Sequence, residues 1–200
     1  MRGGRRVRYA VSVVVAGSAA AVVLAGCGGG DKEPSASPSS TTASPSGSPT
    51  PSAAPVPEPA KQRTGAGAVE FLRFYYAEVG RSQTNPGSVD FGPLSYPGCT
   101  SCAEAVKAQE RDVTSGAYTK EPAMVIEYTA VRDVPNSGDD TYVDYTVQEK
   151  PLPYYVRGQD EPAGTLTAKS ATRIAVIRWT KDGWKLRGMT VEPNDTQSTP

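Results

Sequence analysis

The sequence of 200 residues contains no histidine, and this absence removes most of the familiar catalytic arrangements. A Ser-His-Asp triad, a Cys-His pair and an Asp-His dyad all need an imidazole ring to move protons. Catalysis would have to use carboxylates and tyrosines, as in enzymes that pair a tyrosine hydroxyl with a carboxylic acid. The acids and tyrosines show no convergent spacing, so we expect no catalytic residue and no enzyme activity. The side chains considered are Tyr75, Tyr76, Tyr128, Tyr145, Asp90, Glu127 and Asp144.

Cysteine is nearly as scarce, because the chain has only Cys27, Cys99 and Cys102. A tetrahedral zinc site takes four nitrogen or sulfur ligands, and Cys99 and Cys102 supply only two in a chain without histidine. The stretches "TSGAYTKEP" and "PNSGDDTYVDY" lack the alternating oxygen ligands and the closing glutamate of a calcium loop. We therefore expect no metal and no cofactor.

Long apolar runs are limited to the N-terminus, which has the three parts of an export signal: arginines, an apolar run over residues 9–24, and small residues. The run is too short and too rich in alanine and glycine for a permanent membrane span. It ends in "LAGC", which resembles the lipobox of bacterial lipoproteins. We expect residues 1–26 to be a signal peptide and Cys27 to carry acyl chains such as palmitate at the outer face of the cytoplasmic membrane. Ordinary secretion is expected, with twin-arginine export through Arg5 and Arg6 as the alternative.

Neither sign of charge dominates, because 21 basic residues are balanced by 21 acidic ones. Removing residues 1–26 takes away four arginines and no acids, which leaves 17 basic residues and a net charge of −4. This balance provides no basic stripe for a phosphate backbone, so we expect no nucleic-acid partner. Membrane attachment must therefore come from the lipid rather than from polybasic attraction.

Residues 27–64 contain the lipid site and a segment with almost no large apolar side chains. Eight prolines and eight serines fall between residues 31 and 60. Such a composition cannot offset the entropy of ordering, so we expect a disordered tether. Prolines favour extended segments of about 3.1 Å per residue, which gives a fully extended reach on the order of 100 Å.

Residues 65–193 are long enough for one globular domain, and a flexible tail is expected over 194–200. The apolar spacing in "GAGAVEFLRFYYAEVGRS" predicts a helix. A loop rich in Pro and Gly follows, and "CTSCAEAVKAQERDVTSG" predicts a second helix that stops at Gly116.

The period then changes to two, which is typical of strands. "PAMVIEYTAVRDV" and "DTYVDYTVQEK" predict a hairpin, with residues 143, 145 and 147 facing inward. "LPYYV" predicts a short strand, and residues 174–179 and 184–191 predict a second hairpin around Asp182-Gly183. Trp179 and Trp184 flank that turn and are expected to pack on each other. Two helices followed by antiparallel strands predict an α+β domain.

This order, with a long aromatic first helix and the closing hairpin "IRWTKDGWKL", resembles the nuclear transport factor-like cone fold. In that fold a curved antiparallel sheet wraps the first helix. More narrowly, "FLRFYY", the Pro/Gly loop, "CTSC", the lipobox and the Ser/Pro tether are similar to a family of actinobacterial lipoproteins of unknown function. The resemblance covers nearly the whole chain and implies a fold and a location, but no activity.

Cys99 and Cys102 admit three interpretations. With Cys27 assigned to lipid, they form an even pair in an oxidising compartment, which favours a structural disulfide. Thiol exchange is the first alternative, but a thioredoxin-like centre needs its CxxC after a buried parallel strand, and here a Pro/Gly loop precedes it. A metal site is the second alternative, and it lacks ligands.

These observations together predict a lipid-anchored, non-catalytic interaction module of the cell envelope. Its tether raises the effective concentration of the domain near an envelope protein or a wall polymer. One alternative is a small-molecule pocket protein or a histidine-free pocket enzyme, which would show a deep apolar cavity with an inward acid of raised pKa. Another is a thiol-disulfide oxidoreductase, which would expose Cys99. The pocket-lining candidates are Tyr75, Tyr76, Tyr128 and Tyr145.

Overall fold

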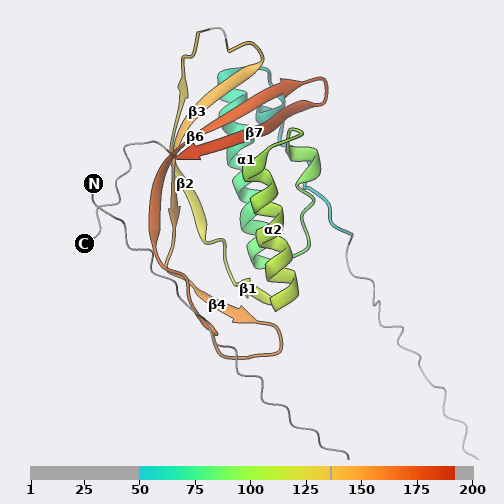
Figure 1. The fold of residues 1–200 in the computed structure, drawn as a ribbon, viewed down its shortest axis with the longest axis vertical. Coiled ribbons are helices and arrows are strands. Elements are labelled where there is room, and N and C mark those ends of the chain that lie inside the picture. The colour runs from blue at the N-terminus through green and yellow to red at the C-terminus, as the bar shows by residue number, and fades with distance from the viewer. Residues whose placement is uncertain (1–49, 136, 192–200) are drawn as a thin grey trace, which may run out of the picture. The chain divides into compact units, whose positions relative to one another are not determined.

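A computed structural model describes residues 50–135 and 137–191, whose fold is shown in Figure 1. Two long helices come first and antiparallel strands follow, so the predicted α+β class is confirmed. The predictions for the signal peptide, Cys27, tether residues 27–49 and the C-terminal tail fall outside these residues. In chain order the elements are η1 (Glu58–Lys61), α1 (Gly65–Thr84), η2 (Gly92–Leu94), α2 (Thr100–Ser115), β1 (Ala117–Thr119), β2 (Met124–Arg132), β3 (Asp140–Glu149), β4 (Pro153–Val156), β5 (Gly164–Thr165), β6 (Lys169–Thr180) and β7 (Gly183–Val191).

Helix α1 begins after Thr64, whose Oγ1 accepts a hydrogen bond from the backbone N of Gly67 at 3.0 Å. Its predicted apolar face is buried, and the side chains of Phe71 and Tyr75 are at most 1% exposed. Gly67 lies where the helix passes the preceding chain, because a Cβ there would be 2.0 Å from the carbonyl O of Gln62. Glycine therefore permits this close approach of two backbone segments.

Helix α2 begins at the cysteine motif, with Cys99 as its N-cap, and ends at Gly116, as predicted. Gly116 has a left-handed φ of 71°, the conformation that glycine adopts readily at a helix C-terminus. The Sγ atoms of Cys99 and Cys102 are 1.99 Å apart, so a disulfide lies within the first turn of α2.

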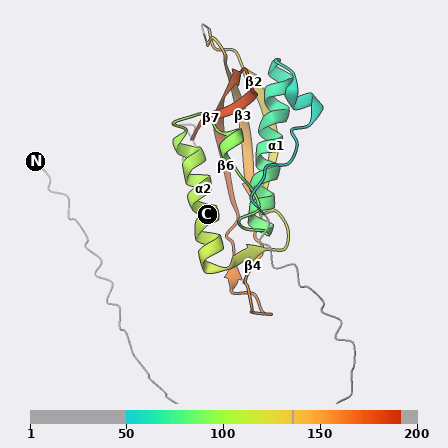
Figure 2. The same cartoon turned by 90° about the vertical axis from the view of Figure 1, so that its right-hand side faces the viewer.

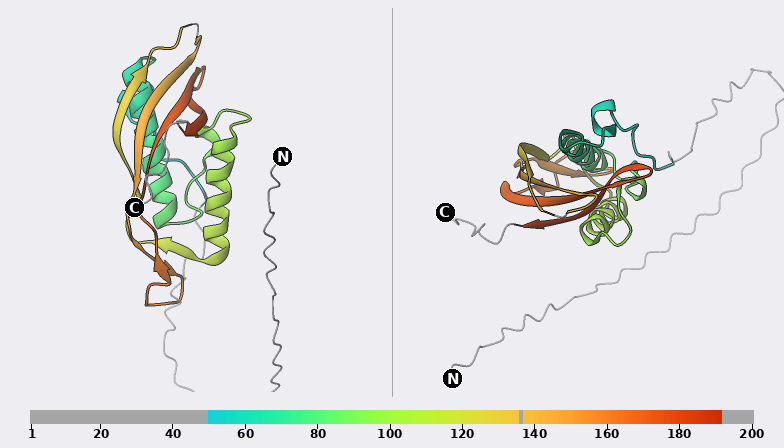
Figure 3. Two further views of the ribbon diagram at one scale, coloured as in Figure 1. Left: turned by 60° about the vertical axis from the view of Figure 1, so that its left-hand side comes forward. Right: turned by 90° about the horizontal axis from the view of Figure 1, so that it is seen from above.

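The main sheet is antiparallel with strand order β2-β3-β6-β7, and it stays open because β2 and β7 lie at its edges. Both predicted hairpins form, since β2 pairs with β3 and β6 pairs with β7. The register shifts between Ile126 and Tyr128 and again between Val176 and Ile177. Such irregularities bend strands and increase their twist, and Figures 1 and 3 show the long strands bending.

A second, smaller sheet with the order β1-β4-β5 differs from the sequence-based expectation. The stretch "LPYYV" does form β4, but β4 pairs with β1 and β5 rather than with the long strands. Strand β1 spans only Ala117–Thr119, which is too short to show an alternating pattern in the sequence.

The core lies between α1 and the inward face of the main sheet. Val143, Tyr145 and Val147 on this face are at most 3% exposed, as their alternation predicts. Helix α1 contacts β2, β3, β6 and β7, whereas α2 contacts α1, β1 and β7 (Figure 2). None of the helices in the described ranges is long and apolar enough to cross a lipid bilayer.

The folded unit begins before the expected boundary at residue 65. Residues 51–61, which we call the strap, pack against the core. Ala53, Ala54 and Val56 are half-buried, and Ala60 is 1% exposed. The expected linker therefore ends earlier than residue 64, because small apolar side chains among the prolines find partners on the domain.

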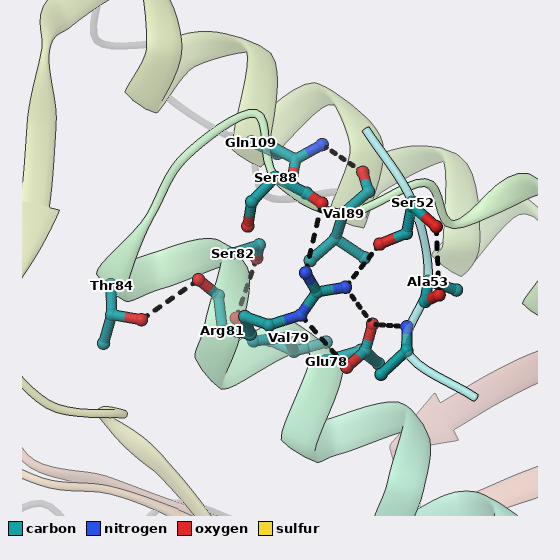
Figure 4. Close-up of polar contacts among 11 residues, drawn as sticks. Ser52, Ala53, Glu78, Val79, Arg81, Ser82, Thr84, Ser88, Val89 and Gln109 are labelled. Atoms are coloured by element: carbon teal, nitrogen blue, oxygen red, sulfur yellow. Dashed lines mark hydrogen bonds and ion pairs between the residues drawn. The ribbon is translucent and has the colours of Figure 1, made fainter. Parts of the chain in front are cut away.

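A buried ion pair holds the strap on α1 (Figure 4). The Glu78 side chain is 5% exposed, and its Oε2 accepts hydrogen bonds from Arg81 Nη2 at 2.5 Å and from the backbone N of Ala54 at 3.0 Å. Arg81 also donates to the carbonyl oxygens of Ser52 at 2.5 Å and Ser88 at 3.2 Å. One ion pair thus joins α1, the strap and the loop after α1.

Candidate ligand pocket

A cavity of about 340 Å³ lies between α1, α2 and strands β2, β6 and β7. Its volume falls near the lower end of the range of about 300–1,000 Å³ typical of small-molecule sites. Most of its wall is aromatic or aliphatic, and α2 supplies several polar side chains. The lining residues are Tyr75, Tyr76, Val79, Ser82, Gln83, Phe91, Ser101, Glu104, Ala105, Ala108, Gln109, Asp112, Met124, Arg173, Met189 and Thr190.

Helix α2 presents one face to the cavity, because its lining residues recur at intervals of three and four positions from Ser101 to Asp112. The middle of this face carries only the methyl groups of Ala105 and Ala108. The cavity therefore occupies the space that larger side chains would fill in a closely packed interface between helix and sheet.

Tyr75 and Tyr76 form part of the cavity wall, and Tyr145 contacts Tyr76. The hydroxyl oxygens of Tyr76 and Tyr145 are 2.9 Å apart, and Met189 Sδ lies 3.4 Å from the first and 2.9 Å from the second. Burial raises the pKa of Tyr75, Tyr76 and Tyr145 above its ordinary value, and the charge of Arg173 opposes this rise for Tyr76 and Tyr145. These hydroxyl groups stay protonated at neutral pH, so they serve as hydrogen-bonding groups rather than as bases.

Three polar atoms of the lining residues are buried without a hydrogen-bond partner among the residues that the structure describes. They are Tyr75 Oη, Gln109 Oε1 and Arg173 Nε. Gln109 Nε2 donates to the carbonyl O of Val89 at 2.9 Å (Figure 4), so Oε1 is the acceptor left unpaired. Each unsatisfied buried group typically costs about 1–3 kcal/mol, and folded proteins contain few of them. Their gathering around one cavity indicates anchoring points for a bound molecule.

Two acids of α2 also border the cavity. Glu104 is exposed, and the hydrogen bond and charge of Lys107, whose Nζ is 2.9 Å away, lower the pKa of its carboxyl group. Burial raises the pKa of Asp112, and the charge of Arg111 opposes this rise. Asp112 therefore combines a raised pKa with a place in the lining of the cavity.

The disulfide lies next to the cavity because Ser101 is between its two cysteines. Ser101 Oγ accepts a hydrogen bond from the backbone N of Met189 at 3.0 Å, which joins the start of α2 to β7. A thiol oxidoreductase would expose Cys99, yet this residue is 7% exposed and Cys102 is 2% exposed. Their burial favours a structural disulfide.

The predicted pocket tyrosines have different positions. Tyr75 and Tyr76 line the cavity, and Tyr145 reaches Tyr76 from β3 without being part of the wall. Tyr128 belongs to β2, and its side chain is outside what the structure describes.

The acids considered for catalysis do not line the cavity. Asp90 Oδ1 accepts a hydrogen bond from the backbone N of Gly92 in η2 at 2.8 Å, and Glu127 accepts one from Gln148 at 2.5 Å. Asp144 forms an ion pair with Arg132 at 2.7 Å. These three acids therefore serve local structure.

The two tryptophans pack on each other, as predicted. The ring centroids of Trp179 and Trp184 are 4.9 Å apart with the planes at 76°. Trp184 Nε1 donates to the carbonyl O of Gln62 at 2.8 Å, which ties the β6–β7 hairpin to the chain after the strap.

The sequence reasoning missed Gln109, Asp112 and Arg173 as pocket residues. The position of Arg173 could have been predicted, because alternate residues of a strand share a face and Arg173 alternates with the buried residues Ala175 and Ile177 along β6. Gln109 and Asp112 carried none, since polar residues on an amphipathic helix normally face solvent.

The described residues thus form an α+β domain with a small-molecule-sized pocket between its helices and its sheet. The chain belongs to a family of unknown function, DUF6318, whose sequence model matches residues 36–190. No curated protein matches the chain.

Solved structures that are similar to the chain include the following two. The crystal structure of the intermembrane space region of chloroplast protein ARC6 is 13% identical, with a TM-score of 0.50, and the match covers 64% of this chain and 95% of that one. A protein from Xanthomonas campestris, described as a calcium/calmodulin dependent protein kinase II association domain, is 14% identical with a TM-score of 0.39, and the match covers 71% of this chain and 94% of that one. The first likeness supports the α+β fold and carries no function.

Proposed function

We propose that this chain is a lipid-anchored binding module of the bacterial cell envelope, whose cavity takes a small, largely apolar molecule without converting it. The observation that carries this proposal is the cavity with three unpaired polar atoms at its wall. A bound molecule would remove apolar wall from water, at about 25 cal/mol per Å², and would give those atoms partners. The protonated tyrosines would act as hydrogen-bonding groups on the ligand.

The proposed location is supported by the N-terminal sequence. The "LAGC" motif resembles a lipobox, and the Ser/Pro-rich tether gives the domain reach beyond the membrane surface. The finer resemblance to actinobacterial lipoproteins with a nuclear transport factor-like cone is part of this proposal, and the bent main sheet packed on α1 supports it. An envelope protein or a wall polymer is the expected partner of the outer surface.

Filling the cavity should weaken ligand binding. The mature chain, residues 27–200, carrying Cys27→Ser so that no lipid is attached, is titrated with the neutral dye N-phenyl-1-naphthylamine, and its fluorescence is recorded. In the double variant Ala105→Leu/Ala108→Leu, isobutyl groups replace the methyl groups that leave the cavity open. We expect the dye affinity to fall by about tenfold or more, because the apolar contact area inside the cavity is lost.

The matched control is Ala103→Leu, which makes the same change on the exposed side of α2. This variant should bind the dye as the parent does. If the double variant keeps the parent affinity while remaining folded, the cavity is not the binding site.

Anchoring is tested on the full chain in a bacterial host. Cys27→Ser should move the protein from the membrane fraction to the culture fluid or the soluble envelope fraction, because the lipid is the proposed anchor. Metabolic labelling with a palmitate analogue should mark the parent and not the variant. Equal membrane retention of the two proteins would rule out the lipid anchor.

A further inference from the structure

Arg173 lies in an unusual position on β6. Its Cα is in register with that of Tyr145 on β3, and its side chain lines the cavity, half-buried from solvent. No carboxylate within residues 50–135 and 137–191 forms an ion pair with it, and its Nε has no hydrogen-bond partner there. The other half-buried arginines differ, since Arg81 binds Glu78 and Arg178 binds Asp140.

An unpaired guanidinium at an apolar wall is costly, because the charge has lost part of its hydration without gaining a counter-ion. The hydroxyl groups of Tyr76 and Tyr145 interact with Arg173 by hydrogen bonds, but neither hydroxyl carries a negative charge. A guanidinium matches a carboxylate or sulfonate in shape and charge, and such charge-assisted hydrogen bonds are among the strongest in proteins. The missing partner of Arg173 is therefore expected to be an anion.

Other charges near the cavity fit this assignment. Glu104, an exposed acid of the cavity wall, is already paired with Lys107. Asp112 is half-buried beside the positive charge of Arg111. Arg173 is the only basic side chain among the residues that line the cavity, so a negative headgroup has one preferred position.

The remainder of the cavity wall is suited to hydrocarbon. Val79, Phe91, Met124 and Met189 provide aliphatic, aromatic and thioether surface, and methionine adapts readily to ligands of different shape. Resting on the proposed function of the pocket, we infer that its ligand is an amphiphilic organic acid whose anionic head pairs with Arg173. The hydrocarbon body of that acid lies along these apolar side chains.

The test compares decanoate, decanol and decylammonium, which share one chain and differ in the charge of the head. Each displaces N-phenyl-1-naphthylamine from the mature Cys27→Ser chain, and each is also titrated directly by calorimetry. We expect decanoate to bind about tenfold or more tightly than decanol, and decylammonium to bind most weakly. Equal affinity for the three compounds, or a preference for decylammonium, overturns the inference.

Arg173→Met keeps the length and packing of the side chain and removes the charge. It should bring the affinities of decanoate and decanol to within about twofold of each other, and continued dye binding would show that the variant still forms the pocket. The matched control is Arg157→Met, an exposed arginine after β4, which should change nothing. An unchanged preference for decanoate in Arg173→Met would exclude Arg173 as the head site.

The inference and the proposed function fail in different ways. If the dye and all three decyl compounds fail to bind, the pocket function itself is wrong and the acid preference falls with it. In a second outcome, the dye and decanol bind, Ala105→Leu/Ala108→Leu weakens their binding, and Arg173→Met leaves the affinity for decanoate relative to decanol unchanged. The proposed pocket is then supported, and only the inference about Arg173 is wrong.

Discussion

Replacing Arg81 with methionine is expected to lower the free energy of unfolding by about 2–4 kcal/mol, because it leaves the buried carboxylate of Glu78 without its counter-charge. Breaking a fully buried pair typically costs about 3–5 kcal/mol, and the 37% exposure of the Arg81 side chain reduces that figure. The same change removes the hydrogen bonds to the carbonyl oxygens of Ser52 and Ser88. Urea unfolding of the mature chain measures the loss.

Two comparisons separate the charge effect from general damage. The double variant Glu78→Gln/Arg81→Met should recover part of the loss, since no uncompensated charge remains buried. Glu104→Gln breaks an exposed ion pair with the same spacing on α2, and we expect almost no change in the free energy of unfolding, because water screens exposed pairs. If Arg81→Met costs no more than Glu104→Gln, the strap is not held by this ion pair.

Release of the strap should also be visible without denaturant. Trypsin cleaves after lysine, and Lys61 is at the end of the strap. Arg81→Met should therefore be cut faster after Lys61 than the parent, because local opening exposes that bond. A strap that stays bound to α1 would place the end of the expected tether before residue 51 rather than at residue 64.

The order of elements could be predicted from the sequence because its signals are local. The apolar spacing around Phe71 and Tyr75 identifies α1, and the alternation at Val143, Tyr145 and Val147 identifies the inward face of β3. Gly116 marks the end of α2, because glycine readily adopts the left-handed backbone conformation in which helices often end.

The strap and the small sheet could not be predicted, because both depend on long-range contacts. The strap has the composition of a linker, and it is held by Glu78 and Arg81, which lie 24 and 29 positions after their partners Ala54 and Ser52. Strand β1 has only three residues and is stabilised by pairing with β4. The two strands are separated in the sequence by the long strands β2 and β3. Neither partner can be inferred from local periodicity.

Two residues of the cavity wall, Tyr75 and Tyr76, could be predicted from the sequence. Tyr75 and Tyr76 were identified because tyrosines on a buried helix face are amphipathic and often meet a cavity or a rim. The presence of an open cavity could not be predicted. Small residues such as Ala105 and Ala108 occur both beside cavities and where helices pack closely. Arg173 could have been found by strand parity, which places it on the same face as Ala175.

Alkaline pH is expected to destabilise the domain steeply, through Tyr75 and Tyr145. Burial raises the pKa of both phenols well above about 10, the value expected in the unfolded chain. Below that pH both states hold the protons, so stability does not change. Above it the unfolded state releases protons that the folded state retains, so the free energy of unfolding falls, by about 1.4 kcal/mol per pH unit for each tyrosine once the unfolded phenols are fully ionised.

The two tyrosines together give a limiting slope of about 3 kcal/mol per pH unit, which would unfold a typical domain of about 5–15 kcal/mol within a few units. Urea unfolding between about pH 8 and 11, with phenolate absorbance recorded in parallel, measures the slope. Tyr145→Phe should remove about half of it, although the lost hydrogen bond to Tyr76 lowers stability at neutral pH by about 1 kcal/mol. Ionisation of all ten tyrosines before unfolding, with stability unchanged, would mean that water reaches these hydroxyl groups in the folded state. In that case the inner wall of the pocket is open to solvent, and the unpaired hydroxyl of Tyr75 is satisfied by water rather than reserved for a ligand.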